Sequence, residues 1–180
     1  LRDSLFSRVN MFFFAGAGLS QPVWDKLDRI AEQTCGERIR MLTGLGMTES
    51  APFAVCANAE VVKSGYIGLP EPGLELKLVP TGDKTELRYR GPNITSGYWR
   101  APQQNAESFD DEGFYCSGDA VKPIDGLHPE RGLAFDGRTA EDFKLSTGTF
   151  VSVGPLRAKI IAAGDLCVQD VVVTGINRDE

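Results

Sequence analysis

The sequence predicts a mixed α/β fold in three consecutive parts: the last portion of a parallel α/β subdomain, a small distorted antiparallel β-barrel, and the start of a C-terminal α+β domain. Three observations predict it. A strand, a helix and a second strand follow one another early in the chain, short alternating strands with many turns fill the middle, and helical spacing returns after Arg138. We expect the parts to span residues 1–55, 56–138 and 139–180.

The first part has the pattern of a parallel sheet. Val9 to Gly16 (VNMFFFAG) is a nearly unbroken apolar run, typical of a strand that is buried on both faces. Ser20 is expected to cap a helix that Gly36 ends. Arg38 to Leu42 predicts a second strand. The loop that follows, Thr43 to Ser50, therefore leaves the carboxyl end of the sheet, where such sheets bind ligands.

The middle part has the pattern of short antiparallel strands. Leu74 to Val79 and Glu86 to Arg90 alternate apolar and polar residues on either side of a Thr-Gly-Asp-Lys turn, which predicts a hairpin. Further strands are expected at Gly113 to Cys116 and Leu133 to Phe135. Glycines and prolines recur between Gly65 and Gly97, and many short strands with frequent turns favour a small barrel.

In the third part, Asp142 to Leu145 and Thr149 to Val153 predict a hairpin across a turn at residues 146–148. A helix over residues 152–164, capped by its serine and ended by its glycine, and a strand over residues 167–175 are expected to follow. The chain begins without methionine, in residues that look like the end of a helix, and it ends shortly after a predicted strand. We expect it to be a piece of a larger protein.

The composition excludes several classes of protein. The chain has 180 residues, 42% of them hydrophobic, and a formal charge of −6, whereas nucleic-acid binders need clustered Lys and Arg. Its longest apolar run, Met11 to Leu19, is far shorter than the roughly 20 residues of a membrane span. We therefore expect neither nucleic acid nor a membrane as a partner. Four widely separated cysteines favour free thiols in a cytoplasmic protein: Cys35, Cys56, Cys116 and Cys167.

Three short segments carry residues suited to holding a magnesium nucleotide. In the first, TGLGMTES, Gly44 and Gly46 would let the backbone approach a flat ligand closely. Thr48 offers a hydroxyl, and Glu49 offers a carboxylate that can ligate Mg²⁺. A turn with a solvent-exposed glutamate would produce the same string.

In the second segment, FYCSGDA, Asp119 follows a Ser-Gly turn, so its carboxylate can accept hydrogen bonds from the two hydroxyls of a ribose. In the third, Arg138 brings a planar donor fork suited to ribose and phosphate oxygens, and Lys144 adds a positive charge. Each residue also has an ordinary explanation, as an aspartate that satisfies its own turn or a cation in a surface ion pair. The three segments together, in one order, favour a nucleotide site.

These motifs resemble the adenylate-forming superfamily of acyl- and aryl-CoA synthetases, the AMP-binding enzymes, over essentially the whole chain. Within the aryl branch they are most similar to feruloyl-CoA synthases. The segments that carry the resemblance are AGAGLS (15–20), TGLGMTES (43–50), SAPFAV (50–55), GYIGLPEPGLELKLV (65–79), LRYRGPNITSGYW (87–99), FYCSGDA (114–120) and DGRTAEDFKLSTGTFVSVGPLR (136–157).

The resemblance implies roles for individual residues. Thr48 would contact phosphate and Glu49 would bind Mg²⁺, while Asp119 and Arg138 would hold the ribose and phosphates of ATP. The resemblance also implies that Lys144 is one of the catalytic residues. The residues implied to line the pockets are Ala15, Gly16 and Gly44 for the nucleotide, and Gly44, Pro52 and Phe53 for the acid.

The implied reaction depends on ATP and Mg²⁺. A small aryl carboxylic acid, a hydroxycinnamate such as ferulate, attacks ATP to give an acyl-adenylate, and coenzyme A then displaces AMP to give an aryl-CoA thioester. Such chemistry relies on positioning and charge stabilisation. The alternatives are a synthetase for benzoate or a medium-chain acid, an adenylating enzyme that loads a carrier protein, and a non-catalytic fragment that only binds.

The chain departs from the superfamily pattern at several places. Leu45 stands where an aromatic residue usually stacks on adenine, and Ala140 stands at the hinge about which the C-terminal lid rotates, commonly Asp or Lys. The superfamily's glycine-, serine- and threonine-rich phosphate loop and its lid lysine do not occur in these 180 residues. We therefore expect this piece to be inactive by itself.

Overall fold

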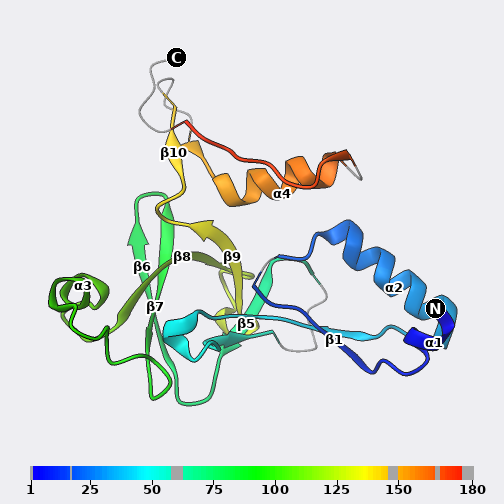
Figure 1. Cartoon of the computed structure of the whole chain (residues 1–180), viewed down its shortest axis with the longest axis horizontal. Coiled ribbons are helices and arrows are strands. Elements are labelled where there is room, and N and C mark those ends of the chain that lie inside the picture. The colour runs from blue at the N-terminus through cyan, green and yellow to red at the C-terminus, as the bar shows by residue number, and fades with distance from the viewer. Residues whose placement is uncertain (1, 17, 58–62, 146–149, 165–166, 176–180) are drawn as a thin grey trace.

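The computed structural model describes residues 2–16, 18–57, 63–145, 150–164 and 167–175. In it a small N-terminal unit of helices and parallel strands lies beside a strongly curved antiparallel sheet, and a C-terminal helix lies along one side of that sheet (Figure 1). None of the described helices has the length and hydrophobicity needed to cross a membrane.

The N-terminal unit has the predicted strand, helix and strand. Its elements are α1 (Arg2–Phe6), β1 (Met11–Phe13), α2 (Gln21–Cys35) and β2 (Arg40–Leu42). β1 and β2 pair in parallel, and Phe6, Ala31 and Ile39 form their small core. Gly36 ends α2 in the left-handed conformation, as predicted, but the Ser20 side chain makes no capping hydrogen bond.

The prediction that the first strand is buried on both faces is wrong. Phe12 packs on the small core, but the side chains of Met11 and Phe13 on either side of it are 48% and 55% exposed. β1 and β2 make up a sheet of two strands, which is too small to be enclosed on both faces by the described part of the chain.

The middle of the chain forms one open sheet in the order β3-β4-β5-β9-β8-β7-β6. Its strands are β3 (Gly44–Leu45), β4 (Val55–Cys56), β5 (Tyr66–Pro70), β6 (Glu75–Thr81), β7 (Lys84–Arg90), β8 (Tyr115–Pro123) and β9 (Leu133–Arg138). The largest core cluster lies on this sheet, around Leu87, Tyr89 and Val121. Because β3 and β6 are its two edges, the predicted barrel is not closed.

The predicted β6–β7 hairpin is confirmed, since the two strands pair over their full lengths. The strand predicted at Gly113 to Cys116 is displaced: β8 runs from Tyr115 to Pro123, so Asp119 lies inside a strand rather than after it. The pairing of β8 with both neighbours is irregular around Asp119, next to Gly118, whose φ of 68° favours glycine. This irregularity has no clear signature in the local sequence.

The structure contains several short elements that the sequence did not predict. They are β3, β4, β5, α3 (Pro102–Ser108) and two 3₁₀ turns, η1 (Thr48–Ser50) and η2 (Pro129–Arg131). Strands of two residues are too short to show alternation. β5 is interrupted by Gly68, where a Cβ would lie 1.6 Å from the Cys56 carbonyl oxygen, so only glycine lets β4 approach this closely.

The C-terminal part starts with the predicted hairpin and helix. β10 (Phe143–Lys144) pairs with β11 (Phe150–Val151), α4 spans Val153–Ala163, and the predicted turn at 146–148 lies outside the described residues. The Ser152 hydroxyl does not cap α4. Asp142 does so, because its Oδ1 accepts a hydrogen bond from the Val153 amide (2.8 Å) while the Ser152 hydroxyl donates to its Oδ2 (3.3 Å).

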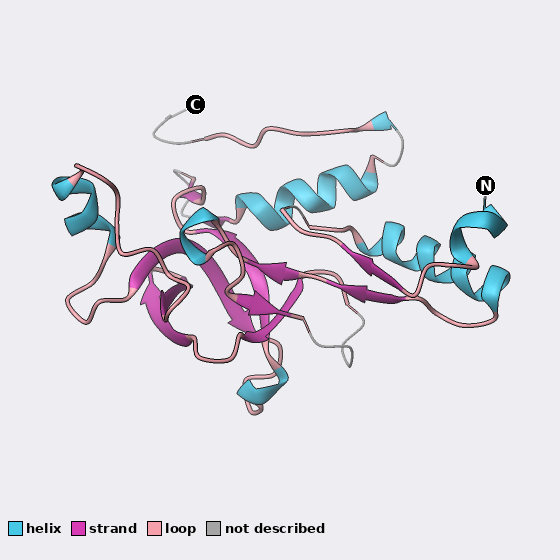
Figure 2. Ribbon diagram, turned by 60° about the horizontal axis from the view of Figure 1, so that its bottom comes forward, coloured by secondary structure: helices cyan, strands magenta, loops and turns pink. Residues whose placement is uncertain are grey.

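The strand predicted over residues 167–175 is wrong. The chain there runs back beside α4 without pairing to a described strand (Figures 1 and 2), and Val172 is 85% exposed. An ion pair between Arg157 of α4 and Asp170 (2.6 Å) ties the segment to the helix. An apolar run becomes a strand only where a partner satisfies its backbone groups, and the described chain supplies none here.

Candidate functional site

The predicted nucleotide-lining residues lie at one edge of the parallel pair. The Phe14 amide donates to the Leu42 carbonyl (3.1 Å), so β1 and β2 stay together up to this point. Ala15 and Gly16 then leave β1, and Gly44 follows β2, all from the carboxyl edge. Ala15 and Gly16 are exposed and Gly44 is half-buried. The structure thus brings these three residues to a shared edge.

The two glycines of TGLGMTES make room for the protein's own backbone. A Cβ on Gly46 would lie 1.8 Å from the carbonyl oxygen of Pro52, and one on Gly44 would lie 2.4 Å from that of Val55. Glycine is therefore required for the chain to fold back over itself after the η1 turn. Packing of the protein's own backbone is thus one reason for these glycines, and the close approach of a flat ligand stays a prediction.

Glu49 lies in η1 with its carboxylate already oriented by the protein. The Tyr98 hydroxyl donates to Glu49 Oε1 at 2.7 Å, and the Tyr115 hydroxyl lies 3.0 Å from that of Tyr98. No donor among the described residues contacts Glu49 Oε2. Thr48, the neighbouring predicted phosphate contact, is exposed. The turn therefore offers one hydroxyl and one carboxylate oxygen to a ligand.

Asp119 and Arg138 face each other across β8 and β9. Arg138 Nη1 lies 3.3 Å from Asp119 Oδ1, with the aspartate side chain 6% exposed and the arginine side chain 47% exposed. Burial raises the pKa of Asp119 above its ordinary value, Arg138 opposes this rise, and the negative charges of Glu141 and Glu86 add to it. The structure thus joins two predicted site residues that are 19 positions apart in the sequence.

The backbone around Asp119 is held from both neighbouring strands. The Gly118 amide donates to Glu86 Oε1 (3.1 Å), and the Gly118 carbonyl accepts from both the amide (2.9 Å) and the hydroxyl (3.1 Å) of Thr139. The Asp119 amide donates to the Ser117 hydroxyl oxygen (3.0 Å). Thr139 directly follows Arg138, so the turn that carries Asp119 is connected to the start of the C-terminal part.

The three residues predicted for the acid pocket, Gly44, Pro52 and Phe53, differ in their surroundings. Phe53 is half-buried, and its ring lies 6.4 Å from that of Phe13 at an interplanar angle of 45°. A Cβ on Gly44 would lie 3.1 Å from the Phe53 ring, so Gly44 and Phe53 are adjacent. Pro52 is exposed. Phe13 was not singled out from the sequence, because an apolar strand residue is ordinarily core.

The remaining predicted positions lie near the C-terminal part. Lys144 lies in β10, six residues after Arg138, and Ala140 is exposed just beyond β9. Leu45, at the position where the superfamily has an aromatic residue that stacks on adenine, is partly buried and packs against the main core cluster. Its contact with adenine stays a prediction.

Residues 93–98 contact the predicted site, although the sequence assigned them no role beyond the family resemblance of residues 87–99. Asn93 Nδ2 donates hydrogen bonds to the backbone carbonyls of Ser50 (2.9 Å) and Phe53 (2.8 Å). The Thr95 amide donates a hydrogen bond to the backbone carbonyl of Glu49 (2.8 Å). This segment contacts residues 49–53 from forty or more positions away in the sequence. No local pattern encodes such a contact.

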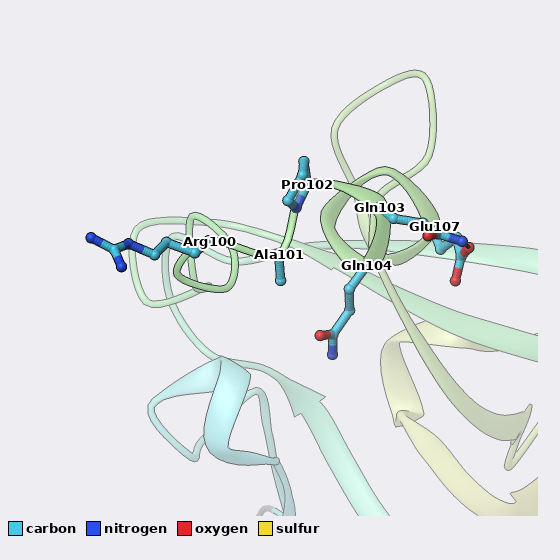
Figure 3. Close-up of a pocket in the computed structure, with 6 residues that line it drawn as sticks. All are labelled: Arg100, Ala101, Pro102, Gln103, Gln104 and Glu107. Carbon is cyan, nitrogen blue, oxygen red and sulfur yellow. Dashed lines mark hydrogen bonds between the residues drawn. The ribbon is translucent and has the colours of Figure 1, made fainter.

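A shallow surface depression of about 480 Å³ lies elsewhere, at the start of α3 (Figure 3). The residues that line it are Arg100, Ala101, Pro102, Gln103, Gln104 and Glu107. None of them is a predicted site residue, and the Arg100 side chain points away from the helix (Figure 3). We therefore base the site on the charged and aromatic residues described above.

Comparison with known proteins agrees with the resemblance in the motifs. A family model described as AMP-binding enzyme matches residues 2–99. Feruloyl-CoA synthase of Amycolatopsis sp is 36% identical over 106 residues, covering 54% of this chain and 21% of that protein. Human mitochondrial malonate–CoA ligase ACSF3 is 26% identical over 203 residues, covering 98% of this chain and 33% of that protein.

The fold is also that of solved adenylating proteins. The crystal structure of ATP-bound MatB from Rhodopseudomonas palustris matches with a TM-score of 0.62 and 25% sequence identity, covering 84% of this chain and 30% of that chain. The chain spans between 12% and 33% of the length of the curated relatives it matches.

Proposed function

The chain belongs to the AMP-binding enzyme family, and from this premise we propose that a protein carrying it joins an aromatic carboxylic acid to coenzyme A at the expense of ATP. In the first step the acid's carboxylate attacks the α-phosphorus of ATP, which forms an acyl-adenylate and releases pyrophosphate. In the second the thiol of coenzyme A attacks the acyl carbon, its proton passes to water, and AMP leaves. The chemistry needs positioned charges rather than a nucleophilic side chain.

The observation that carries the proposal is the buried carboxylate of Asp119 opposite the half-exposed Arg138. Arg138 is the cation that pairs with the Asp119 carboxylate. Among the described residues, no donor makes a hydrogen bond to the Asp119 carboxylate oxygens. A vicinal diol would supply two donors to such an acceptor, and the guanidinium is suited to ribose or phosphate oxygens. This arrangement supports ribose binding by Asp119, with Arg138 on the ribose or phosphates.

The residues present also fit Mg²⁺, with Glu49 as its protein ligand. Glu49 Oε2 has no donor among the described residues, and the described chain has no group of three or more His, Cys, Asp or Glu that could hold a metal. Mg²⁺ is usually bound by one or two carboxylates together with phosphate oxygens and water, which matches a single carboxylate. When bound, it would neutralise phosphate charge, and Thr48 would contact the same phosphates.

The proposed acid is a hydroxycinnamate such as ferulate. Phe53, next to Gly44 and tilted against Phe13, offers an aromatic face to a planar acid. The similarity to a feruloyl-CoA synthase supports the same choice. We place the protein in the cytoplasm, which its four unpaired cysteines support.

The test is a substrate panel with a full-length protein that carries this chain. Pyrophosphate release and thioester formation are measured with ferulate, benzoate and a medium-chain fatty acid, using coenzyme A or an acyl-carrier protein as acceptor. We expect ferulate with coenzyme A to react fastest. Preference for an aliphatic acid or for the carrier protein would contradict the proposed substrate or acceptor, and no adenylate with any acid would contradict the function.

The Asp119→Ala variant tests the nucleotide site within the same assay. Charge-assisted hydrogen bonds contribute about 1.5–3 kcal/mol each, so we expect the catalytic efficiency for ATP to fall at least about tenfold. Asp111→Ala is the matched control, because Asp111 is exposed and lies on the loop before β8. Equal activity of the two variants would contradict the assignment of Asp119.

A further inference from the structure

The carboxylate of Glu49 is held by a hydroxyl relay. A carboxylate only accepts hydrogen bonds, so the Tyr98 hydroxyl must use its proton for Glu49 Oε1 at 2.7 Å. The contact between the Tyr98 and Tyr115 hydroxyls at 3.0 Å is then donated by Tyr115. The two hydroxyls therefore donate in series, from Tyr115 to Tyr98 and from Tyr98 to Glu49.

Tyr98 is itself fixed by a side chain of α3. Asn105 Oδ1 accepts from the Tyr98 amide (2.6 Å), and Asn105 Nδ2 donates to the Tyr98 carbonyl (3.0 Å). The residue before it, Gly97, has a φ of +131°, and a Cβ there would lie 2.9 Å from Asn105 Oδ1. Glycine is thus needed for Asn105 to reach the backbone on both sides of Tyr98. Both ends of the residue are clamped while the hydroxyl points to Glu49.

The backbone of the η1 loop does not depend on this hydroxyl. The Asn93 side chain donates hydrogen bonds to the carbonyls of Ser50 and Phe53. The Thr95 amide donates a hydrogen bond to the carbonyl of Glu49. Apart from its contact with the Tyr115 hydroxyl, the Tyr98 hydroxyl therefore acts on the Glu49 side chain and not on the backbone of the loop. A variant that removes just this hydroxyl separates orientation of the side chain from folding of the loop.

We propose that Tyr98 is a positioning residue for the metal-nucleotide site: by occupying Glu49 Oε1 it fixes the carboxylate so that Oε2 faces the cation. This inference rests on the proposed function, in which Glu49 is the Mg²⁺ ligand. Tyr115 and Asn105 support Tyr98 in turn, so the site extends from η1 across residues 93–98 to β8 and α3.

The test measures metal binding without turnover. A full-length protein carrying this chain is saturated with ATP in the absence of the acid, and Mn²⁺ binding is followed by electron paramagnetic resonance. We expect Tyr98→Phe to raise the Mn²⁺ concentration for half-saturation by about tenfold, the factor that one charge-assisted hydrogen bond supplies. Affinity for AMP without metal and the melting temperature should stay as in the parent protein. The control is Ser108→Ala, which removes a hydroxyl that donates to the Gln104 carbonyl within α3 (2.7 Å) and takes no part in the relay.

Two results would overturn the inference. One is unchanged Mn²⁺ binding in Tyr98→Phe. The other is an equal loss of metal-free AMP affinity or of melting temperature, which would show a structural role for the hydroxyl. Glu49→Gln separates this inference from the proposed function. If Glu49→Gln weakens Mn²⁺ binding while Tyr98→Phe does not, the positioning role of Tyr98 is rejected and the metal role of Glu49 still stands. If neither variant changes Mn²⁺ binding, the metal role of Glu49 fails as well.

Discussion

The carboxylate of Asp119 is buried, and burial disfavours its charged form. The nearby positive charge of Arg138 compensates for part of this free-energy cost. The net direction is a raised pKa, so the folded chain binds this proton more readily than the unfolded chain does. Between the ordinary pKa of aspartate, about 3.9, and the raised folded value, stability therefore falls as the pH rises. Above that window the whole cost is present. A carboxylate retained at such a cost fits a ligand-binding role.

We accordingly expect Asp119→Asn to be more stable than the parent chain at pH 7, because the amide carries no charge to bury. The gain should shrink as the pH is lowered through the raised folded pKa, and it should disappear below the unfolded pKa of about 3.9, where the aspartate is neutral in both states. Arg138, left without its partner, is half-exposed and stays solvated. Melting temperatures of both chains between pH 4 and 7 measure the difference. A variant that melts below the parent chain at pH 7 would show that the ion pair outweighs the burial.

At the scale of elements, one buried ion pair joins the C-terminal part to the curved sheet. Lys84, at the start of β7, pairs with Asp142, and the two side chains are 5% and 2% exposed. Lys84 Nζ also donates to the Asp136 carbonyl, and Asp142 caps α4 through the Val153 amide. The position of α4 on the sheet thus depends on a charge pair that is closed to water.

Lys84→Met is therefore expected to destabilise the chain by about 3–5 kcal/mol, since it leaves Asp142 buried without a countercharge. Hydrogen exchange at the Val153 amide should accelerate, because the Asp142 carboxylate that caps α4 loses the cation that holds it in place. Lys122→Met is the control: Lys122 pairs with Asp136 at 2.8 Å but is 62% exposed, and such pairs contribute about 0–1 kcal/mol. Similar effects of the two variants would mean that the Lys84 pair does not anchor the helix.

At the scale of the molecule, the site is assembled from separate parts of the chain. It combines the carboxyl edge of β1 and β2, the η1 turn, and the Asp119–Arg138 pair on β8 and β9. β8 connects them, since Tyr115 contacts Tyr98 while Asp119 lies four residues further along, at most about 13 Å away between Cα atoms. Met11 and Phe13 remain half-exposed beside this edge.

The chain by itself is expected to form no acyl-adenylate. The phosphate loop and the lid lysine of the superfamily do not occur in its 180 residues, so nothing in it would take their place around the triphosphate. Incubation with ATP, Mg²⁺ and a hydroxycinnamate, followed by a pyrophosphate assay, checks this. A full-length protein that carries the chain is the positive control. Pyrophosphate released by the isolated chain would contradict the expectation.

The site was predicted from the sequence as a set of residues, and their chemical roles stay predictions. Motif spacing singled out Glu49, Asp119 and Arg138, since each motif is local. Tyr98 and Asn93 were missed because they act on residues more than forty positions earlier. Asp119 was placed after a strand instead of within one, because a bulge depends on register with the neighbouring strands.

Local sequence was sufficient to predict the α/β class, the β6–β7 hairpin, the end of α2 at Gly36 and the family to which the chain belongs. Each of these follows from periodicity, turn residues or motifs within a short stretch. Three features became known from the folded chain: the sheet stays open, residues 167–175 form no strand, and Tyr98 contacts Glu49. These depend on which distant segments pair and in which register, and that choice is made by the packing of the whole chain.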